Sequence, residues 1–171
     1  MLINLTDIFT EEGKSVTREV MPELTEICFG GENCGIREKT PVRLTLTHLK
    51  PGKALVEAEG KISLDMRCDR CLCPVVKELE YHASEEVSAP DVEDGQEDGN
   101  ILDGYQLNVD SLISNEIFAC WPAKVLCRED CRGLCRVCGK DLNEGDCGCD
   151  TFVPDPRMAA IMDIFRENKE V

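Results

Sequence analysis

The sequence predicts an α+β protein built on an antiparallel β-sheet or partly open barrel. Long stretches alternate apolar and polar residues, a later stretch has helical spacing, and cysteines cluster after it. We expect a β-rich domain over residues 1–121 with a helix near residues 110–121. A cysteine-rich lobe over residues 122–171 would end in a short C-terminal helix and dock on a hairpin tip at residues 68–71.

The first third of the chain has a weak pattern. Apolar residues within positions 1–10 predict a first short strand, whereas residues 11–39 are mixed. The pair Gly30-Gly31 indicates a turn inside this mixed region. A clear strand begins after Pro41, where apolar residues alternate with polar ones: Val42, Leu44 and Leu46.

Residues 54–87 predict a long hairpin whose tip carries Cys68 and Cys71. One parity of its first strand is apolar and the other is polar, as in an antiparallel sheet packed on one side. Gly60, in the middle of that strand, predicts a bulge or a bend. The apolar parity comprises Val56, Ala58, Ile62, Leu64, Met66 and Cys68.

Residues 84–103 are rich in acids and glycine. No Lys or Arg occurs between Lys77 and Lys124, an interval that carries 12 of the 34 acidic residues. We interpret residues 84–103 as a solvated, partly disordered loop, the alternative being a functional acidic arm.

Helical spacing follows the acidic stretch. Asp110 is the expected N-cap, and Pro122 ends the run. The dipeptide Asp155-Pro156 predicts the start of the C-terminal helix. Apolar residues fall on one face of the first helix: Val109, Leu112, Ile113, Ile117, Cys120 and Trp121.

Charge limits the partners that this chain can bind. The formal net charge is −15, so the average surface repels a phosphate backbone and favours basic protein surfaces. The first residues lack the basic and apolar segments of a signal peptide, and no apolar run is long enough to span a membrane. We therefore expect a cytoplasmic protein, without membrane or small-molecule partners, whose cysteines bind metal or serve redox chemistry.

Six of the 12 cysteines lie between residues 127 and 149. The sequence Cys135-Arg-Val-Cys138-Gly has the spacing of a metal knuckle, in which the glycine provides the backbone freedom that the turn needs. Cys147 and Cys149 offer a second pair nearby. These four cysteines predict one zinc site.

The remaining Cys127 and Cys131 would pair with Cys68 and Cys71 in a second zinc site. The crossed arrangement, in which Cys68 and Cys71 meet Cys135 and Cys138, stays open, because spacing does not decide between the two. We favour the sequential pairing, since the local site closes the shorter loop.

Cysteines and histidines can also serve redox chemistry or a catalytic zinc ion. A thiol redox motif requires a helix N-terminus to lower the thiol pKa, and both CxxC pairs are expected on turns. A catalytic zinc would use histidine or carboxylate ligands, whereas His48 and His82 lie in strand-like patterns and read as sheet residues. The four leftover cysteines are Cys28, Cys34, Cys73 and Cys120; the first two read as free thiols or a weak extra site, and Cys120 as core.

Basic residues accumulate next to the cysteines. They would neutralise the charge of the zinc-bound thiolates, or they would form a local basic patch that contacts RNA phosphate. The residues of this patch are Arg67, Arg70, Arg128, Arg132 and Arg136.

Several motifs together resemble the YceD family, the bacterial large ribosomal RNA subunit accumulation proteins. They are CDRCL over residues 68–72, DCRGLCRVCGKDLN over residues 130–143, the Cys147-Gly-Cys149 pair and the DPR sequence over residues 155–157. The resemblance covers roughly residues 54–165. Arg136 departs from the family pattern, in which proline is expected, and this should relax the knuckle without removing a ligand.

This resemblance implies a non-enzymatic role in large-subunit (23S) rRNA accumulation and ribosome biogenesis. Together with the acidic charge, the resemblance favours an assembly factor that binds a ribosomal protein or a pre-ribosomal particle. Such a factor would contain two structural zinc ions. The alternatives are a CxxC thiol oxidoreductase and a zinc-ribbon transcription accessory protein.

Overall fold

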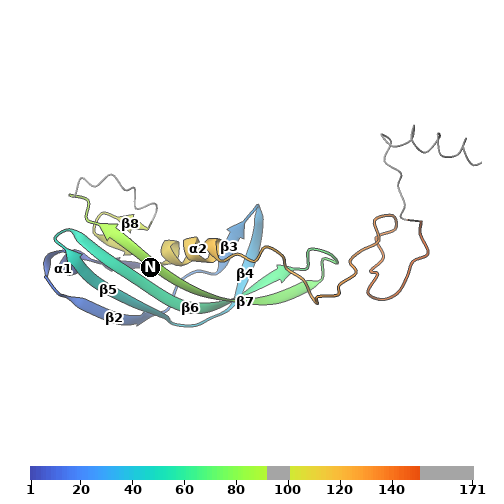
Figure 1. Cartoon of the computed structure of the whole chain (residues 1–171), viewed down its shortest axis with the longest axis horizontal. Coiled ribbons are helices and arrows are strands. Elements are labelled where there is room, and N and C mark those ends of the chain that lie inside the picture. The colour runs from blue at the N-terminus through green and yellow to red at the C-terminus, as the bar shows by residue number, and fades with distance from the viewer. Residues whose placement is uncertain (92–100, 151–171) are drawn as a thin grey trace, which may run out of the picture. The chain divides into compact units, whose positions relative to one another are not determined.

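A computed structural model describes residues 1–91 and 101–150 of the chain (Figure 1). These residues form two compact units. Among the described residues, unit 1 consists of residues 1–68, 73–91 and 101–127, and unit 2 consists of residues 69–72 and 128–150. The few residues at 69–72 therefore belong with the cysteine-rich part of the chain.

Unit 1 is built on a six-stranded antiparallel sheet. Its strand order is β2-β5-β6-β4-β3, with β7 paired to β6 as well. The strands are β2 (Ser15–Val20), β3 (Glu26–Phe29), β4 (Glu32–Lys39), β5 (Val42–Lys50), β6 (Lys53–Arg67) and β7 (Pro74–Ser88).

Strand β6 is the centre of this sheet because it pairs on both edges. On one edge β7 follows it along its whole length, from Lys53↔Ser88 to Arg67↔Pro74. The other edge is shared, since β5 pairs as far as Glu59 and β4 pairs from Ile62 onward. The predicted long hairpin with its tip after Arg67 is confirmed.

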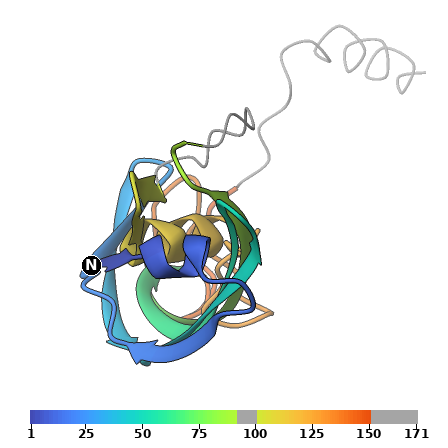
Figure 2. The ribbon, with the colours of Figure 1, turned by 90° about the vertical axis from the view of Figure 1, so that its left-hand side faces the viewer.

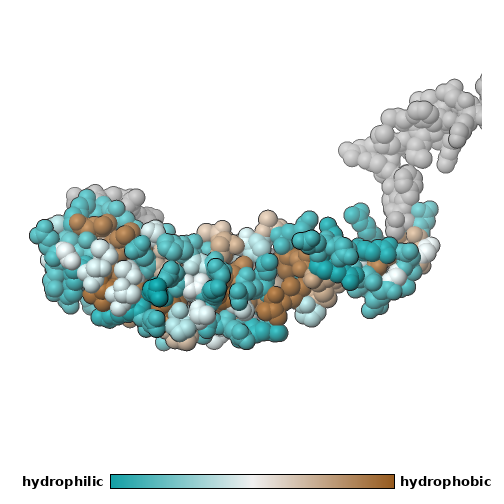
Figure 3. Space-filling model, turned by 60° about the horizontal axis from the view of Figure 1, so that its bottom comes forward, coloured by the Kyte–Doolittle hydropathy of each residue, from teal (hydrophilic) through white to brown (hydrophobic). Residues whose placement is uncertain are grey.

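The apolar parity of β6 faces the core, as the alternation predicts. Hydrophilic side chains cover most of the face drawn in Figure 3, which agrees with a sheet that is packed on one side. The buried side chains of the hairpin are Ala54, Val56, Ala58, Ile62, Leu64 and Met66 from β6, with Leu79, Tyr81, Ala83 and Val87 from β7.

A second sheet has three strands in the order β1-β9-β8. These are β1 (Leu2–Asn4), β9 (Gln106–Asn108) and β8 (Leu102–Asp103), and the two helices are α1 (Thr6–Thr10) and α2 (Val109–Ala119). Figure 2 shows the strands of unit 1 curving around α2. The apolar face of α2 is buried against them through Leu112, Ile113 and Ile117. The α+β class with open antiparallel sheets is confirmed.

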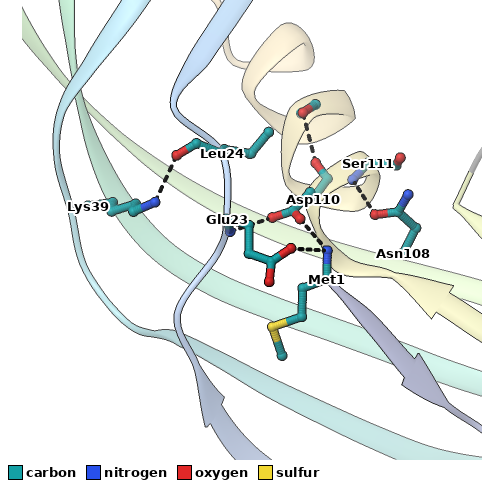
Figure 4. A network of polar contacts seen from close by, with 8 residues as sticks. Met1, Glu23, Leu24, Lys39, Asn108, Asp110 and Ser111 are labelled. Atoms are coloured by element: carbon teal, nitrogen blue, oxygen red, sulfur yellow. Dashed lines mark hydrogen bonds and ion pairs between the residues drawn. The ribbon is translucent and has the colours of Figure 1, made fainter.

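The helix near residues 110–121 exists, but its predicted N-cap is wrong. It spans Val109–Ala119, and the side chain of Asn108 caps it by accepting from the Ser111 N–H at 3.2 Å. Asp110 instead accepts from the Glu23 N–H at 2.9 Å and pairs with the terminal amino group of Met1 (Figure 4). This pairing raises the pKa of that amine, mainly through the Asp110 carboxylate.

The N-terminal region contains more structure than its pattern indicated. Only Leu2–Asn4 of the predicted first strand is extended, because Asn4 Oδ1 accepts from the Thr6 N–H at 2.8 Å and α1 begins there. Residues 11–39 hold β2, β3 and β4, which the sequence reading missed. The turn at Gly30-Gly31 is confirmed, with φ of 60° and 88°.

The bulge predicted at Gly60 is wrong for the β6–β7 ladder, whose register runs unbroken through Gly60↔Tyr81. The missing side chain makes room for an aromatic ring instead. A Cβ at Gly60 would lie 2.6 Å from Tyr81 Oη. Burial beside it raises the pKa of Tyr81 to about 12.

The predicted acidic loop starts later than expected. Strand β7 continues to Ser88 because the alternation persists, with Val87 buried and Lys53 paired to Glu86 at 3.1 Å. Residues 102–103 form β8. Residues 92–100 and the predicted C-terminal helix at Asp155-Pro156 lie outside the described residues.

Candidate metal centres

The knuckle at Cys135–Cys138 is held by backbone hydrogen bonds. The Cys135 N–H donates to Lys140 O at 2.8 Å, and the Gly139 N–H donates to Cys135 O at 2.8 Å. Gly139 has φ of 73°, the left-handed conformation that the sequence reading required after the second cysteine. The Val137 N–H points at Cys135 Sγ from 3.4 Å. The turn therefore provides a backbone N–H donor to the Cys135 sulfur, and such a hydrogen bond stabilises a metal-bound thiolate.

Cys147 and Cys149 face this knuckle. The sulfurs of Cys135, Cys138, Cys147 and Cys149 all lie within 4.8 Å of one another, and we name them the second cysteine group. The loop between the pairs is closed by Lys140 Nζ, which donates to Asp146 O at 3.1 Å. Arg132 pairs with the Asp146 carboxylate on the same loop.

Hydrogen bonds within the second group shift the pKa values of two of its thiols in opposite directions. Backbone N–H groups of Cys138 and Val137 lower the pKa of Cys135 to about 6. Hydrogen bonds to the Cys138 and Cys147 sulfurs raise the pKa of Cys149 to about 12. A bound dication would displace these protons, so metal affinity should increase with pH.

The sulfurs of Cys68, Cys71, Cys127 and Cys131 also lie within 4.8 Å of one another and form the first cysteine group. Cys68, Cys71 and Cys131 are buried, whereas Cys127 is exposed. The Cys68 N–H donates to Cys73 O at 2.9 Å, which closes the hairpin tip. Leu72 follows the second cysteine with φ of 61°, so both knuckles use the left-handed conformation at this position.

Within unit 2, residues 69–72 are fixed to the segment around Cys131. Arg70 Nη1 donates to Cys131 O at 2.6 Å, and the Leu134 N–H donates to Arg70 O at 3.1 Å. Gly133 allows this approach, because a Cβ there would lie 2.8 Å from Arg70 O. The first cysteine group therefore sits at a tightly packed backbone crossing.

Asn143 is a supporting residue that the sequence reading missed. Its Nδ2 donates to Cys131 Sγ at 3.4 Å and to Asp141 Oδ1 at 2.7 Å. Its Oδ1 accepts from the Arg132 N–H at 2.8 Å. The only signal was the position of Asn143 in the GKDLN sequence between the two groups, and a side-chain hydrogen bond to a thiolate leaves no periodic pattern.

Both groups fit a tetrahedral zinc ion. Zinc binds thiolate sulfur at about 2.3 Å, which places the four sulfurs of a tetrahedron about 3.8 Å apart. The separations within 4.8 Å agree with that size. Each group supplies four sulfurs and neither includes histidine or carboxylate, the donor set of closed structural sites. Within residues 1–91 and 101–150 these are the two groups of side chains placed so that they could hold a metal ion.

The other cysteines and the histidines lie outside these groups. Burial raises the pKa of the Cys34 and Cys120 thiols, so both resist ionisation. Cys28 is exposed on β3. His48 is buried in β5, where its Nδ1 lies 2.8 Å from Ile8 O, consistent with a satisfied sheet residue.

The arginines next to the cysteines have varied surroundings. Arg70 binds the Cys131 carbonyl, Arg128 pairs with Asp130 at 3.4 Å, and Arg132 pairs with Asp146. Arg67 and Arg136 are exposed. Nearby oxygens therefore already contact three of the five residues of the predicted basic patch.

The family model for the large ribosomal RNA subunit accumulation protein YceD matches residues 56–165. The chain belongs to this family. The matched segment contains both cysteine groups, β7 and α2, and it leaves out β1 to β5. No curated protein and no solved structure matches the chain.

Membership supports a role in ribosome biogenesis, and the cysteine groups fit the metal-binding type that the sequence indicated. The family is described by rRNA accumulation rather than by a reaction. Among the residues that the structure describes, no helix is long and apolar enough to cross a membrane.

Proposed function

We propose that this protein is a non-enzymatic assembly factor for the large ribosomal subunit that binds a ribosomal protein or a pre-ribosomal particle. The observation that carries the proposal is the pair of closed four-cysteine groups inside the segment that matches the family. Four thiolates leave no open coordination position for a substrate, so the zinc ions stabilise a binding surface.

In this proposal zinc holds residues 69–72 in place within unit 2. The ligands of the first group come from two short segments that are far apart in the chain, Cys68–Cys71 and Cys127–Cys131. Metal binding adds to the hydrogen bonds between Arg70 and the segment around Cys131. The zinc ion of the first group would thereby attach the C-terminal lobe predicted at residues 122–171 to the hairpin tip.

Charge favours a protein partner over naked RNA. The net charge of −15 attracts the basic proteins of the ribosome and repels phosphate. Contact with rRNA through Arg67, Arg70, Arg128, Arg132 and Arg136 is the narrower version of the proposal. That version predicts a steep loss of affinity with salt and a further loss when Arg136 is replaced by glutamate.

Zinc content tests the structural part of the proposal. The purified protein should contain two zinc ions, as the two groups predict, and Cys68→Ser or Cys135→Ser should each reduce the content to one. Cys28→Ser is the matched control, because Cys28 belongs to neither group, and it should leave the zinc content unchanged. A parent protein with a single zinc ion that Cys68→Ser does not remove would refute the first site.

Sedimentation tests the partner. In cells lacking the gene, the wild-type chain should restore 23S rRNA and sediment with large-subunit precursors, whereas the Cys68→Ser/Cys135→Ser double variant should do neither. Turnover of a dithiol substrate by the zinc-loaded protein would instead support the oxidoreductase alternative. Co-purification with RNA polymerase, and not with ribosomal particles, would support the transcription accessory protein.

A further inference from the structure

Three aromatic rings gather where the β3–β4 hairpin meets the end of α2. Phe29 stacks on Trp121 with ring centroids 4.5 Å apart and planes at 23°. Phe118 lies beside Phe29, with centroids 5.8 Å apart. We call Phe29, Phe118 and Trp121 the aromatic cluster, and all three residues belong to unit 1.

Two rings of the aromatic cluster are exposed in a way that the core rings are not, and Trp121 is half-buried against the core. Phe29 is 41% exposed and Phe118 is 37% exposed, whereas Phe9 is 2% and Tyr81 is 5% exposed. Rings that only closed the end of the core would be covered like Phe9. Grouped exposed aromatic side chains are typical of binding surfaces, where they supply much of the affinity.

The chain segments that carry the aromatic cluster are acidic. No Lys or Arg occurs between Arg18 and Arg37 or between Lys77 and Lys124, the two stretches that carry the three rings. Glu32 is the direct partner of Phe29 across the β3–β4 ladder. Glu116 lies in the last turns of α2, and its carbonyl accepts from the Cys120 N–H at 3.0 Å.

Helix α2 adds to this potential. It ends at Ala119 with Cys120 as C-cap, and no basic side chain occupies its last turn. The carbonyl end of a helix carries about half a negative charge. The faces of aromatic rings also attract cations. The helix end, the carboxylates and the ring faces therefore all favour a cation that brings apolar groups with it.

We propose that the aromatic cluster binds a basic peptide segment of a protein partner. An arginine or lysine of that segment would lie over the exposed rings while a neighbouring residue contacts Glu32. Single-stranded nucleic acid also stacks on aromatic rings, but its phosphates would meet a net negative charge, because Glu32 and Asp65 line the hollow beside Phe29 together with the single basic residue Arg67. This inference deepens the proposed function and rests on it for the source of the segment.

Trp121 is the single tryptophan of the chain, so its fluorescence reports binding at the cluster directly. The probe is a short synthetic peptide that alternates arginine with leucine, and the full chain is used in its zinc-loaded form. We expect a saturable change in Trp121 emission. The same peptide with glutamate in place of arginine, and oligouridine, should give none.

Variants separate binding at the cluster from general attraction to an acidic protein. Phe29→Ala should weaken binding about tenfold, the effect of one lost aromatic contact with a cation and an apolar group. Glu32→Gln should weaken binding about 3-fold and reduce its salt dependence. Val76→Ala is the control, because Val76 is 47% exposed on β7 and lies outside the cluster.

Several results would overturn the inference. The first is that the arginine peptide does not bind. The second is that Phe29→Ala and Glu32→Gln both bind the peptide as tightly as the parent does. The third is that oligouridine changes the Trp121 emission. Because Glu32 is exposed, Glu32→Gln keeps the test meaningful if Phe29→Ala unfolds. Zinc content and sedimentation with ribosomal particles are measured on the same variants, so failure of peptide binding is distinguishable from failure of the proposed function.

Discussion

Replacing Gly133 by alanine tests whether the backbone crossing in unit 2 supports metal binding. Gly133 has φ of 77°, and an added Cβ would lie 2.8 Å from Arg70 O and 3.2 Å from Arg70 Cβ. The carbonyl of Arg70 cannot move away freely, because it accepts from the Leu134 N–H at 3.1 Å. The substitution therefore costs both backbone strain and a steric overlap.

The size of the effect follows from a matched glycine. Gly139 has φ of 73° but nothing within 4 Å of its Cβ position, so Gly139→Ala pays only the conformational term. That term is about 1–2 kcal/mol. The overlap at Gly133 adds about 1–3 kcal/mol. Because folding of small metal sites is coupled to metal binding, the loss of zinc affinity relative to the parent should be about 5- to 150-fold larger for Gly133→Ala at the first group than for Gly139→Ala at the second group.

The assay is competition for zinc between each variant and a chelator, with metal content measured at each chelator concentration. Gly133→Ala should release the zinc of the first group before that of the second. Equal losses of zinc affinity in the two alanine variants, each measured against the parent at its own site, would refute the reasoning, since they would show that the overlap with Arg70 adds nothing to the conformational term.

Further predictions concern the sheet and the thiolates. Gly60→Ala should lower the free energy of unfolding by about 1–3 kcal/mol through overlap with Tyr81, and much less in a Tyr81→Ala background, which a double-mutant cycle by urea unfolding would measure. Burial raises the pKa of Tyr81 from 10.0 to about 12, so stability from the neutral phenol is lost as pH rises through this range. Tyr81→Phe should remove that part of the pH dependence; identical slopes for variant and parent would contradict it. Asn143→Ala should weaken zinc binding about tenfold by removing the donor to Cys131 Sγ, and unchanged chelator competition would exclude this role.

Regular periodicity made the centre of the fold predictable. The alternation along β6 and β7 is long, and the inward side chains of β6 are buried on either side of Gly60, so register and tip position follow from the pattern. Strand β2 was missed because it pairs only with β5 and buries little of its surface. The N-cap of α2 was misplaced by two positions, since Asn108 and Asp110 are both good caps and only the contact of Asp110 with Glu23 decides between them.

The cysteine spacing indicated two groups but not the contacts that support them. The sequence reading named the eight cysteines, and the structure brings their sulfurs together in two sets of four. It gave no sign of Gly133 against Arg70 or of Asn143 beside Cys131, because these contacts join residues that no local rule connects. The aromatic cluster was not predicted either, because Phe29 lies in the N-terminal region whose sequence pattern is mixed.

The path of the chain between its units affects how the protein is made and how it can be divided. The chain passes between unit 1 and unit 2 three times, after Cys68, after Leu72 and after Cys127. A fragment that begins at Arg128 would lack Arg70 and its hydrogen bonds, so no single cut yields an intact unit 2. During synthesis at about 5–20 residues per second, residues 69–72 must wait about 3–12 s for Cys131 to be added. The thiols of the hairpin tip are open to oxidation and to other metals during that interval.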